Sequence, residues 1–283
     1  MAAGLSFARS FLFLPADRLE RLPKAQGSGA HAIVLDLEDA VAPEHKDGAR
    51  EALAAQWPAE DAAARARLLV RINAAGTPWH EADLDLLTKL PGLGAVMLPK
   101  AEVPADLRRV HDALPAFALL PLVESAEGFA ALDLIARVPG VLRLAFGHLD
   151  FQSDLGMACE ADEAELVPAR LALVLASRRA NLPPPVDGVT VALQDAARLE
   201  QDCRRARRFG FGAKLCIHPA QVAVVNHALG PSPEEQAWAR RVLATAATRA
   251  EGAFRFEGTM VDAPVLARAR RYAQDIDKPQ ENA

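Results

Sequence analysis

The chain has 283 residues, of which 51% are hydrophobic, and its 37 acidic and 32 basic side chains give a formal net charge of −5. Charges of both signs are interspersed, and no basic face carries interleaved aromatic residues, so nucleic acid is not expected as a partner. No apolar stretch approaches the roughly 18 residues of a membrane span, and the three cysteines lack metal-ligand spacing, which predicts a cytoplasmic protein with reduced thiols and no membrane contact.

Short apolar runs alternate with longer helical patterns along the chain. The expected strands are 10–15, 32–36, 68–73, 94–99, 119–124, 142–146, 185–190 and 213–218. The helical patterns between them cover 18–27, 44–57, 78–90, 104–114, 126–137, 162–181 and 193–209. Such alternation is typical of βαβ units with a parallel sheet, and eight units predict a closed (β/α)₈ barrel, the TIM barrel. A doubly wound open sheet is the alternative, because the seventh strand is short and flanked by prolines.

The chain continues beyond the eighth expected strand. The sequence SPEE at 232–235 has the pattern of a capping box with proline at the first helical position, which predicts a helix to about Arg249. An irregular segment, 251–259, follows, and another helix is expected from Met260. We therefore expect two domains, a barrel over 1–230 and a C-terminal helical extension or lid over 231–283, whose last residues, 275–283, form a solvated tail.

Two acidic residues close apolar runs that lie one βα unit apart. Glu124 follows ALLPLV at 118–123, and Asp150 closes the run 142–150. The carboxyl ends of parallel strands meet at one rim, where enzymes of this architecture hold their chemistry, so both carboxylates are expected there. Two carboxylates with open positions between them suit Mg²⁺ or Mn²⁺ shared with an oxygen-rich substrate. The alternative for Asp150 is that it only caps the following helix.

Other expected strands also end in ionisable side chains: Asp36, Glu38, Asp39, Arg71, Lys100 and His218. For Glu38 and Asp39 we expect a role in orienting Arg71 or the waters of a metal rather than direct metal binding. Lys100 is interpreted as an ion-pair partner rather than a Schiff-base lysine. For His218, a structural hydrogen bond and a substrate contact are both open. His148, beside Asp150, is expected to be a packed strand residue.

A linear series of motifs lies at these rim positions. The segments are RSFLFLPADR at 9–18, VLDLEDAVAP at 34–43, VRIN at 70–73, MLPK at 97–100, VES at 123–125, GHLDF at 147–151, IHPAQ at 217–221 and GTMVD at 258–262. Together they resemble the citrate lyase β-subunit/malyl-CoA lyase family, the CitE-like branch of the HpcH/HpaI aldolase superfamily, over nearly the whole chain. The chain departs from the family pattern at Ala16, where glycine is usual, and at Leu19, where proline is common.

The resemblance implies a (β/α)₈ barrel that binds Mg²⁺ and cleaves or forms a carbon–carbon bond next to a thioester. Motif by motif, it implies metal ligands at Glu124 and Asp150, an arginine for the keto acid and the enolate at Arg71, and a catalytic aspartate at Asp262. It implies further contacts to the acyl-CoA or acid substrate from Phe13, Arg18, Lys24 and His218. It also implies a homotrimer or higher homo-oligomer, in which the C-terminal segment closes a neighbouring subunit's site.

The leading hypothesis is a Mg²⁺-dependent carbon–carbon lyase for a 3-hydroxyacyl-CoA such as malyl-CoA or citramalyl-CoA, with a 2-oxo acid and an acyl-CoA as the other reaction partners. One alternative is a metal-dependent pyruvate-type aldolase that does not use CoA. Another is a citrate lyase β subunit that works within a multienzyme complex. Arg18 and Lys24, together with the segment that carries Asp262, favour the thioester hypothesis. For Asp262 the alternative role is to cap the last helix.

Overall fold

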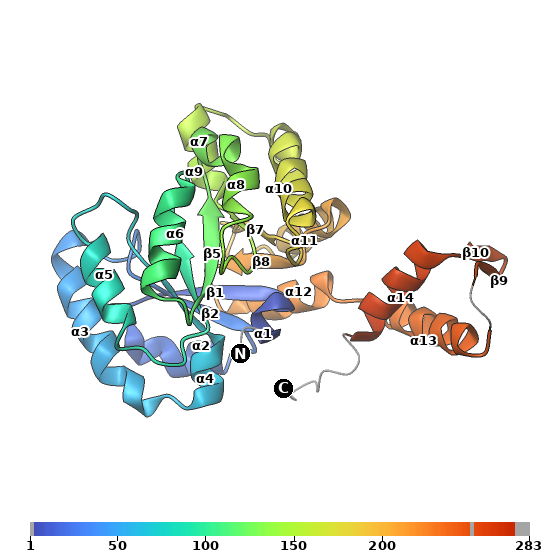
Figure 1. Cartoon of the computed structure of the whole chain (residues 1–283), viewed down its shortest axis with the longest axis horizontal. Coiled ribbons are helices and arrows are strands. Elements are labelled where there is room, and N and C mark those ends of the chain that lie inside the picture. The colour runs from blue at the N-terminus through green and yellow to red at the C-terminus, as the bar shows by residue number, and fades with distance from the viewer. Residues whose placement is uncertain (1–2, 250–251, 275–283) are drawn as a thin grey trace. The chain divides into compact units, whose positions relative to one another are not determined.

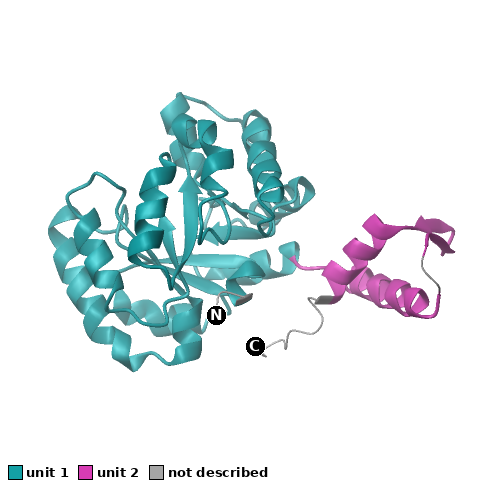
Figure 2. Cartoon of the chain, viewed as in Figure 1, with its two compact units in different colours: residues 1–229 teal, residues 230–283 magenta. Residues whose placement is uncertain are grey.

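The computed structural model describes residues 3–249 and 252–274. The chain divides into two compact units, residues 1–229 and residues 230–283 (Figure 2). In the described part of the chain, no helix combines the length and the apolar character needed to cross a membrane. The tail predicted over 275–283 lies outside the described residues.

In the first unit, eight parallel strands close into a barrel in the order β1 to β8, with helices on its outer side (Figure 1). The strands are β1 (Ser10–Pro15), β2 (Ala32–Asp36), β3 (Leu68–Arg71), β4 (Ala95–Leu98), β5 (Ala118–Val123), β6 (Ala145–Phe146), β7 (Val186–Asp187) and β8 (Ala213–Cys216). The predicted (β/α)₈ barrel is confirmed, and the open-sheet alternative is wrong, because β8 pairs with β1 through Ser10–Leu12.

The helices of the first unit are α1 (Ala3–Ser6), α2 (Leu22–Gln26), α3 (Lys46–Gln56), α4 (Ala62–Arg67), α5 (His80–Leu87), α6 (Pro104–Ala113), α7 (Ala126–Ala130), α8 (Leu132–Ile135), α9 (His148–Leu155), α10 (Val167–Arg179), α11 (Ala196–Phe209) and α12 (Ala220–Leu229). Short 3₁₀ helices are η1 (Leu19–Arg21), η2 (Pro43–His45), η3 (Trp57–Ala59) and η4 (Ala164–Leu166). The sequence analysis did not predict α1, α4 or α9.

Helix α9 corrects the expected position of Asp150. Strand β6 has only two residues, and the chain turns at Gly147 into a helix whose first turn contains Asp150. Asp150 therefore does not end a strand. His148, expected to be a packed strand residue, is buried but is the first residue of this helix. The long apolar run 142–150 hid the boundary, because a run of this kind is compatible with a buried strand or a buried helix end.

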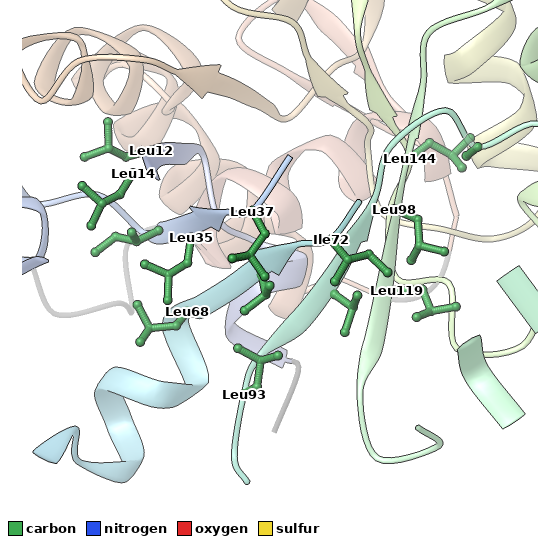
Figure 3. Packing of buried hydrophobic residues seen from close by; sticks show 14 of the residues in the cluster. Leu12, Leu14, Leu35, Leu37, Leu68, Ile72, Leu93, Leu98, Leu119 and Leu144 are labelled. Carbon is green, nitrogen blue, oxygen red and sulfur yellow. The ribbon is translucent and has the colours of Figure 1, made fainter. Parts of the chain in front are cut away.

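Neighbouring strand residues face two different apolar layers. On β1, Phe11 belongs to the cluster inside the barrel, whereas Leu12 belongs to the cluster between the strands and the surrounding helices. Side chains of this outer cluster, among them Leu14, Leu35 and Leu119, are drawn in Figure 3. Burial of a leucine side chain contributes roughly 1.5–3 kcal/mol relative to its exposure. The two layers therefore hold the strands, and with them the rim at their carboxyl ends, in fixed positions.

The second unit contains α13 (Pro233–Ala247), the antiparallel strands β9 (Phe254–Phe256) and β10 (Thr259–Val261), and α14 (Ala263–Gln274). The predicted capping box is confirmed: the Glu235 N–H donates to the Ser232 hydroxyl at 3.2 Å, and the Ser232 N–H donates to the Glu235 carboxylate at 2.8 Å. The buried core of this unit consists of Ala239, Val242, Val261 and Ala269.

The expectation of an irregular segment before the last helix is wrong for its described residues, which form a hairpin. Phe256 pairs with Thr259, so Glu257 and Gly258 alone make the turn. Their φ angles are +47° and +80°, and two consecutive left-handed residues are what a tight hairpin turn requires. Glutamate seldom adopts this conformation, so the sequence carried no clear signal for the turn.

Candidate metal and substrate site at the barrel rim

Glu124 follows β5 and is 4% exposed. The backbone N–H of Lys100 donates a 2.7 Å hydrogen bond to its Oε1 atom. Burial, together with the nearby carboxylates of Glu38 and Asp150, raises the pKa of Glu124 to about 8, although this hydrogen bond and the charge of Arg71 lower it. A buried carboxylate that is hard to ionise by itself ionises more readily when a bound cation supplies opposite charge.

Asp150 is exposed in the first turn of α9, after the strand that pairs with β5. No hydrogen bond or ion pair reaches its carboxylate from the residues that the structure describes. Gly147, the residue before α9, packs against the Glu124 carboxylate, so the first turn of α9 lies at the same rim as Glu124. The structure thus brings the two predicted metal ligands to the same rim, although Asp150 comes from a helix and not from a strand end.

These two carboxylates fit the requirements of Mg²⁺. Within residues 3–249 and 252–274, no group of three or more histidine, cysteine, aspartate or glutamate side chains is placed to hold a metal by itself. Mg²⁺ is commonly held by one or two carboxylates and keeps waters and substrate oxygens as its other ligands. Glu124 and Asp150 supply hard oxygen donors of this type and leave positions open for a substrate.

Arg71 ends β3, and its guanidinium is held in one orientation. Its Nε atom donates to Asp36 Oδ1 at 2.7 Å, and its Nη2 atom donates to Asp36 Oδ2 at 2.6 Å. The guanidinium carbon lies 4.8 Å from the centre of the Phe13 ring. Burial lowers the pKa of Arg71, but the bonds to Asp36 and nearby carboxylates raise it more, so Arg71 stays charged. Arg71 and Phe13, two of the predicted site residues, are therefore neighbours.

The remaining guanidinium nitrogen of Arg71, Nη1, faces two acidic residues of the loop after β2. It lies 2.9 Å from Glu38 Oε2 and 3.8 Å from Asp39 Oδ2. Glu38 is 6% exposed, and burial raises its pKa to about 7 although Arg71 lowers it. Lys100 Nζ lies 3.4 Å from Glu38 Oε1, so Lys100 is an ion-pair partner, as predicted. Glu38 therefore contacts the cations of the rim.

A polar network that the sequence analysis missed supports this loop. The buried Lys46 ammonium donates 2.7 Å hydrogen bonds to the carbonyls of Leu37 and Glu38 and to Asn73 Oδ1. Asn73 in turn donates from its backbone N–H and its side chain to Asp83 Oδ2, each at 2.7 Å. The bidentate partner of Arg71, Asp36, was also not assigned a role. The clustering of acids in VLDLED at 34–39 was the only available signal for it.

Three predicted substrate contacts lie exposed on the first unit. Arg18 precedes η1 and Lys24 lies on α2, and within the described residues neither side chain forms a hydrogen bond or an ion pair. His218 precedes α12, and its Nδ1 atom accepts a 3.2 Å hydrogen bond from the N–H of Ala220. The structural hydrogen bond considered for His218 is therefore present. The substrate contacts of Arg18, Lys24 and His218 stay predictions.

Asp262 belongs to the second unit, whereas the other predicted site residues belong to the first. Its Oδ1 atom accepts a 3.2 Å hydrogen bond from the N–H of Val265, in the first turn of α14. The capping role considered for Asp262 is therefore confirmed. The side chain is exposed, and a carboxylate that accepts one hydrogen bond keeps acceptor capacity for a second partner. A catalytic role for Asp262 stays a prediction.

Known proteins resemble the chain over most of its length. A family model described as HpcH/HpaI aldolase/citrate lyase matches residues 9–219. A citrate lyase subunit beta-like protein of Deinococcus radiodurans is 39% identical over 285 residues, which covers 95% of this chain and 98% of the relative. A (3S)-malyl-CoA thioesterase of Cereibacter sphaeroides is 34% identical over 266 residues, 93% of this chain and 92% of the relative.

Solved structures also resemble this chain over most of its length. CitE of Mycobacterium tuberculosis in complex with magnesium, acetoacetate and coenzyme A matches with a TM-score of 0.82 and 36% sequence identity, over 98% of this chain and 100% of that chain. The family resemblance inferred from the rim motifs is thereby confirmed. The chain belongs to the HpcH/HpaI aldolase/citrate lyase family and is an enzyme of the lyase class.

Proposed function

We propose that this enzyme is a Mg²⁺-dependent lyase that cleaves or forms a 3-hydroxyacyl-CoA such as malyl-CoA or citramalyl-CoA, with a 2-oxo acid and an acyl-CoA as the other reactants. The observation that carries this proposal is the arrangement at the rim, where Glu124 and Asp150 offer an open carboxylate pair and Arg71 is held by two hydrogen bonds to Asp36. The similarity to a CitE structure that contains magnesium, acetoacetate and coenzyme A supports the same reaction class.

In the cleavage direction, a base removes the proton of the substrate hydroxyl. The bond between the α-carbon of the thioester and the β-carbon that carries the hydroxyl then breaks, and the β-carbon becomes the carbonyl of the 2-oxo acid. The electron pair of the broken bond forms the enolate of the acyl-CoA, whose α-carbon finally takes a proton. Mg²⁺, when bound by Glu124 and Asp150, would act as a Lewis acid and a template for the oxygens of the acid fragment.

Arg71 can stabilise the negative charge that develops, because its charge is permanent and its orientation is fixed before the substrate binds. Asp262, from a second copy of the chain in a homotrimer or higher homo-oligomer, is our candidate for the group that exchanges the proton with the enolate carbon. Arg18, Lys24, Phe13 and His218 would contact the acyl-CoA or the acid.

A thioesterase is the second candidate, because a relative at 34% identity is named (3S)-malyl-CoA thioesterase. The two activities are distinguished by incubating the purified protein and Mg²⁺ with malyl-CoA, methylmalyl-CoA, citramalyl-CoA or free citrate. We expect a 2-oxo acid from one of the thioesters without an equivalent of free CoA thiol. Free thiol without oxo acid would indicate a thioesterase, and cleavage of free citrate would contradict the proposal for a CoA-ester lyase.

Lys100 should not form a covalent intermediate. Burial lowers the pKa of Lys100, but the carboxylates of Glu38 and Asp39 raise it more, so the net pKa is raised and little free amine is present near neutral pH. We expect borohydride to trap no substrate on Lys100, and we expect EDTA to stop turnover until Mg²⁺ or Mn²⁺ is added back. Covalent labelling of Lys100, or full activity in EDTA, would indicate a Schiff-base aldolase instead.

A further inference from the structure

The carboxylate of Glu124 lies between residues that follow the two neighbouring strands. On the β4 side, Lys100 donates its backbone N–H to Glu124 Oε1 at 2.7 Å. On the β6 side, Gly147 packs against the other carboxylate oxygen: a Cβ atom added to Gly147 would lie 2.6 Å from Glu124 Cβ, and closer still to Oε2. Hydrogen bonds join both sides to β5. The N–H of Ala101, the residue after Lys100, donates to the carbonyl of Leu122, and the N–H of Gly147 donates to the carbonyl of Val123.

The backbone of Lys100 is in an unusual conformation, with a φ of +47°. A residue other than glycine pays roughly 1–2 kcal/mol for a left-handed conformation, and such residues persist where the surrounding structure determines them. The Lys100 side chain is 52% exposed, so its packing does not demand this conformation. In this conformation, the backbone N–H of Lys100 donates its hydrogen bond to the Glu124 carboxylate.

We infer that the left-handed backbone of Lys100 and the absent side chain of Gly147 are positioning elements, which hold the Glu124 carboxylate in the orientation that binds the metal. This inference rests on the proposed function. It concerns the backbone of Lys100 and not its ammonium group, and it gives Gly147 a specific role, because any larger residue there must displace the Glu124 side chain.

The test uses the full-length protein and four variants of one residue: Lys100→Gly, Lys100→Asn, Lys100→Ala and Lys100→Val. All four lack the ammonium group, so differences among them report only the backbone. Glycine and asparagine tolerate a positive φ, alanine tolerates it less, and valine is the least suited because it is β-branched. In calorimetric titration, we expect Lys100→Gly and Lys100→Asn to bind Mg²⁺ with similar affinity to each other. Relative to these two, Lys100→Val should bind Mg²⁺ about tenfold more weakly, and Lys100→Ala should have an intermediate affinity.

A second substitution tests the other side of the carboxylate. Gly147→Ala should weaken Mg²⁺ binding by about tenfold or more, because its Cβ displaces a ligand side chain. The matched control is Gly48→Ala on α3, where a Cβ atom would meet nothing within 4 Å. Asn181→Val controls for strain alone, because Asn181 is exposed and has a φ of +57°; we expect this variant to lose stability and keep its Mg²⁺ affinity.

The outcomes separate the two proposals. If the wild-type protein does not bind Mg²⁺, the proposed function fails. If the wild-type protein binds Mg²⁺ but Lys100→Val and Gly147→Ala bind it as tightly as Lys100→Gly, the positioning role is overturned and the proposed function stands. Should Lys100→Val fail to fold, the comparison of Lys100→Gly with Lys100→Ala decides the question, because alanine disfavours positive φ and introduces no β-branch.

Discussion

Glu124→Gln and Asp150→Asn are each expected to lower Mg²⁺-dependent turnover by about 1,000-fold, which corresponds to about 4 kcal/mol of lost transition-state stabilisation. Each substitution removes one of the two anionic oxygen donors that we propose as the protein ligands of the dication. The fold should be retained, because Asp150 is exposed and Gln keeps an oxygen that can accept from the Lys100 N–H. Calorimetric titration with Mg²⁺ and steady-state turnover measure the two effects.

The control for lost charge is Asp154→Asn. Asp154 is exposed on the same helix as Asp150, and its carboxylate accepts a 2.7 Å hydrogen bond from the Ala126 N–H, which an asparagine oxygen can also accept. We expect turnover to change by less than about twofold, as is usual for a surface charge outside the site. Unchanged Mg²⁺ affinity in both Glu124→Gln and Asp150→Asn would show that Glu124 and Asp150 are not the metal ligands.

Asp262→Asn and Arg71→Ala proteins, each inactive alone, are expected to regain activity when they are co-assembled. If Asp262 serves the barrel of a neighbouring copy, a random mixture of the two chains contains intact sites made from the barrel of one chain and the Asp262 of the other. About one quarter of the sites should then be intact, because each of the two components comes from the correct chain half of the time. Size-exclusion chromatography of differently tagged chains verifies mixing, and turnover per oligomer gives the recovered fraction.

A mixture of Arg71→Ala with Glu124→Gln provides the matched control. Both residues lie in the first unit, so no combination of these chains restores a barrel that carries both, and the mixture should stay inactive. Absence of activity in confirmed mixed oligomers of Asp262→Asn and Arg71→Ala would refute a site shared between subunits. It would leave Asp262 with its observed role as the cap of α14.

The sequence alone determined the regular parts of the fold and the chemical character of the rim. Strand periodicity, with apolar residues in short runs separated by helical patterns, is a local property, and it predicted all eight strands of the barrel. The capping box at Ser232 is equally local, because both of its hydrogen bonds join residues three positions apart. The barrel then followed from topology, which carries Glu124 and Arg71 to the same rim once the strands are parallel.

Only the tertiary structure decided how the rim residues meet. The bidentate pair of Arg71 with Asp36 joins residues 35 positions apart, and the bond from Lys100 to Glu124 joins residues 24 positions apart, so no local pattern encodes either contact. The start of α9 at His148 and the left-handed conformation of Lys100 depend on neighbouring strands, which outweigh local propensity. Gly147 is required for a similar reason: the Glu124 side chain, which follows the adjacent strand β5, occupies the space that a Cβ atom at position 147 would fill.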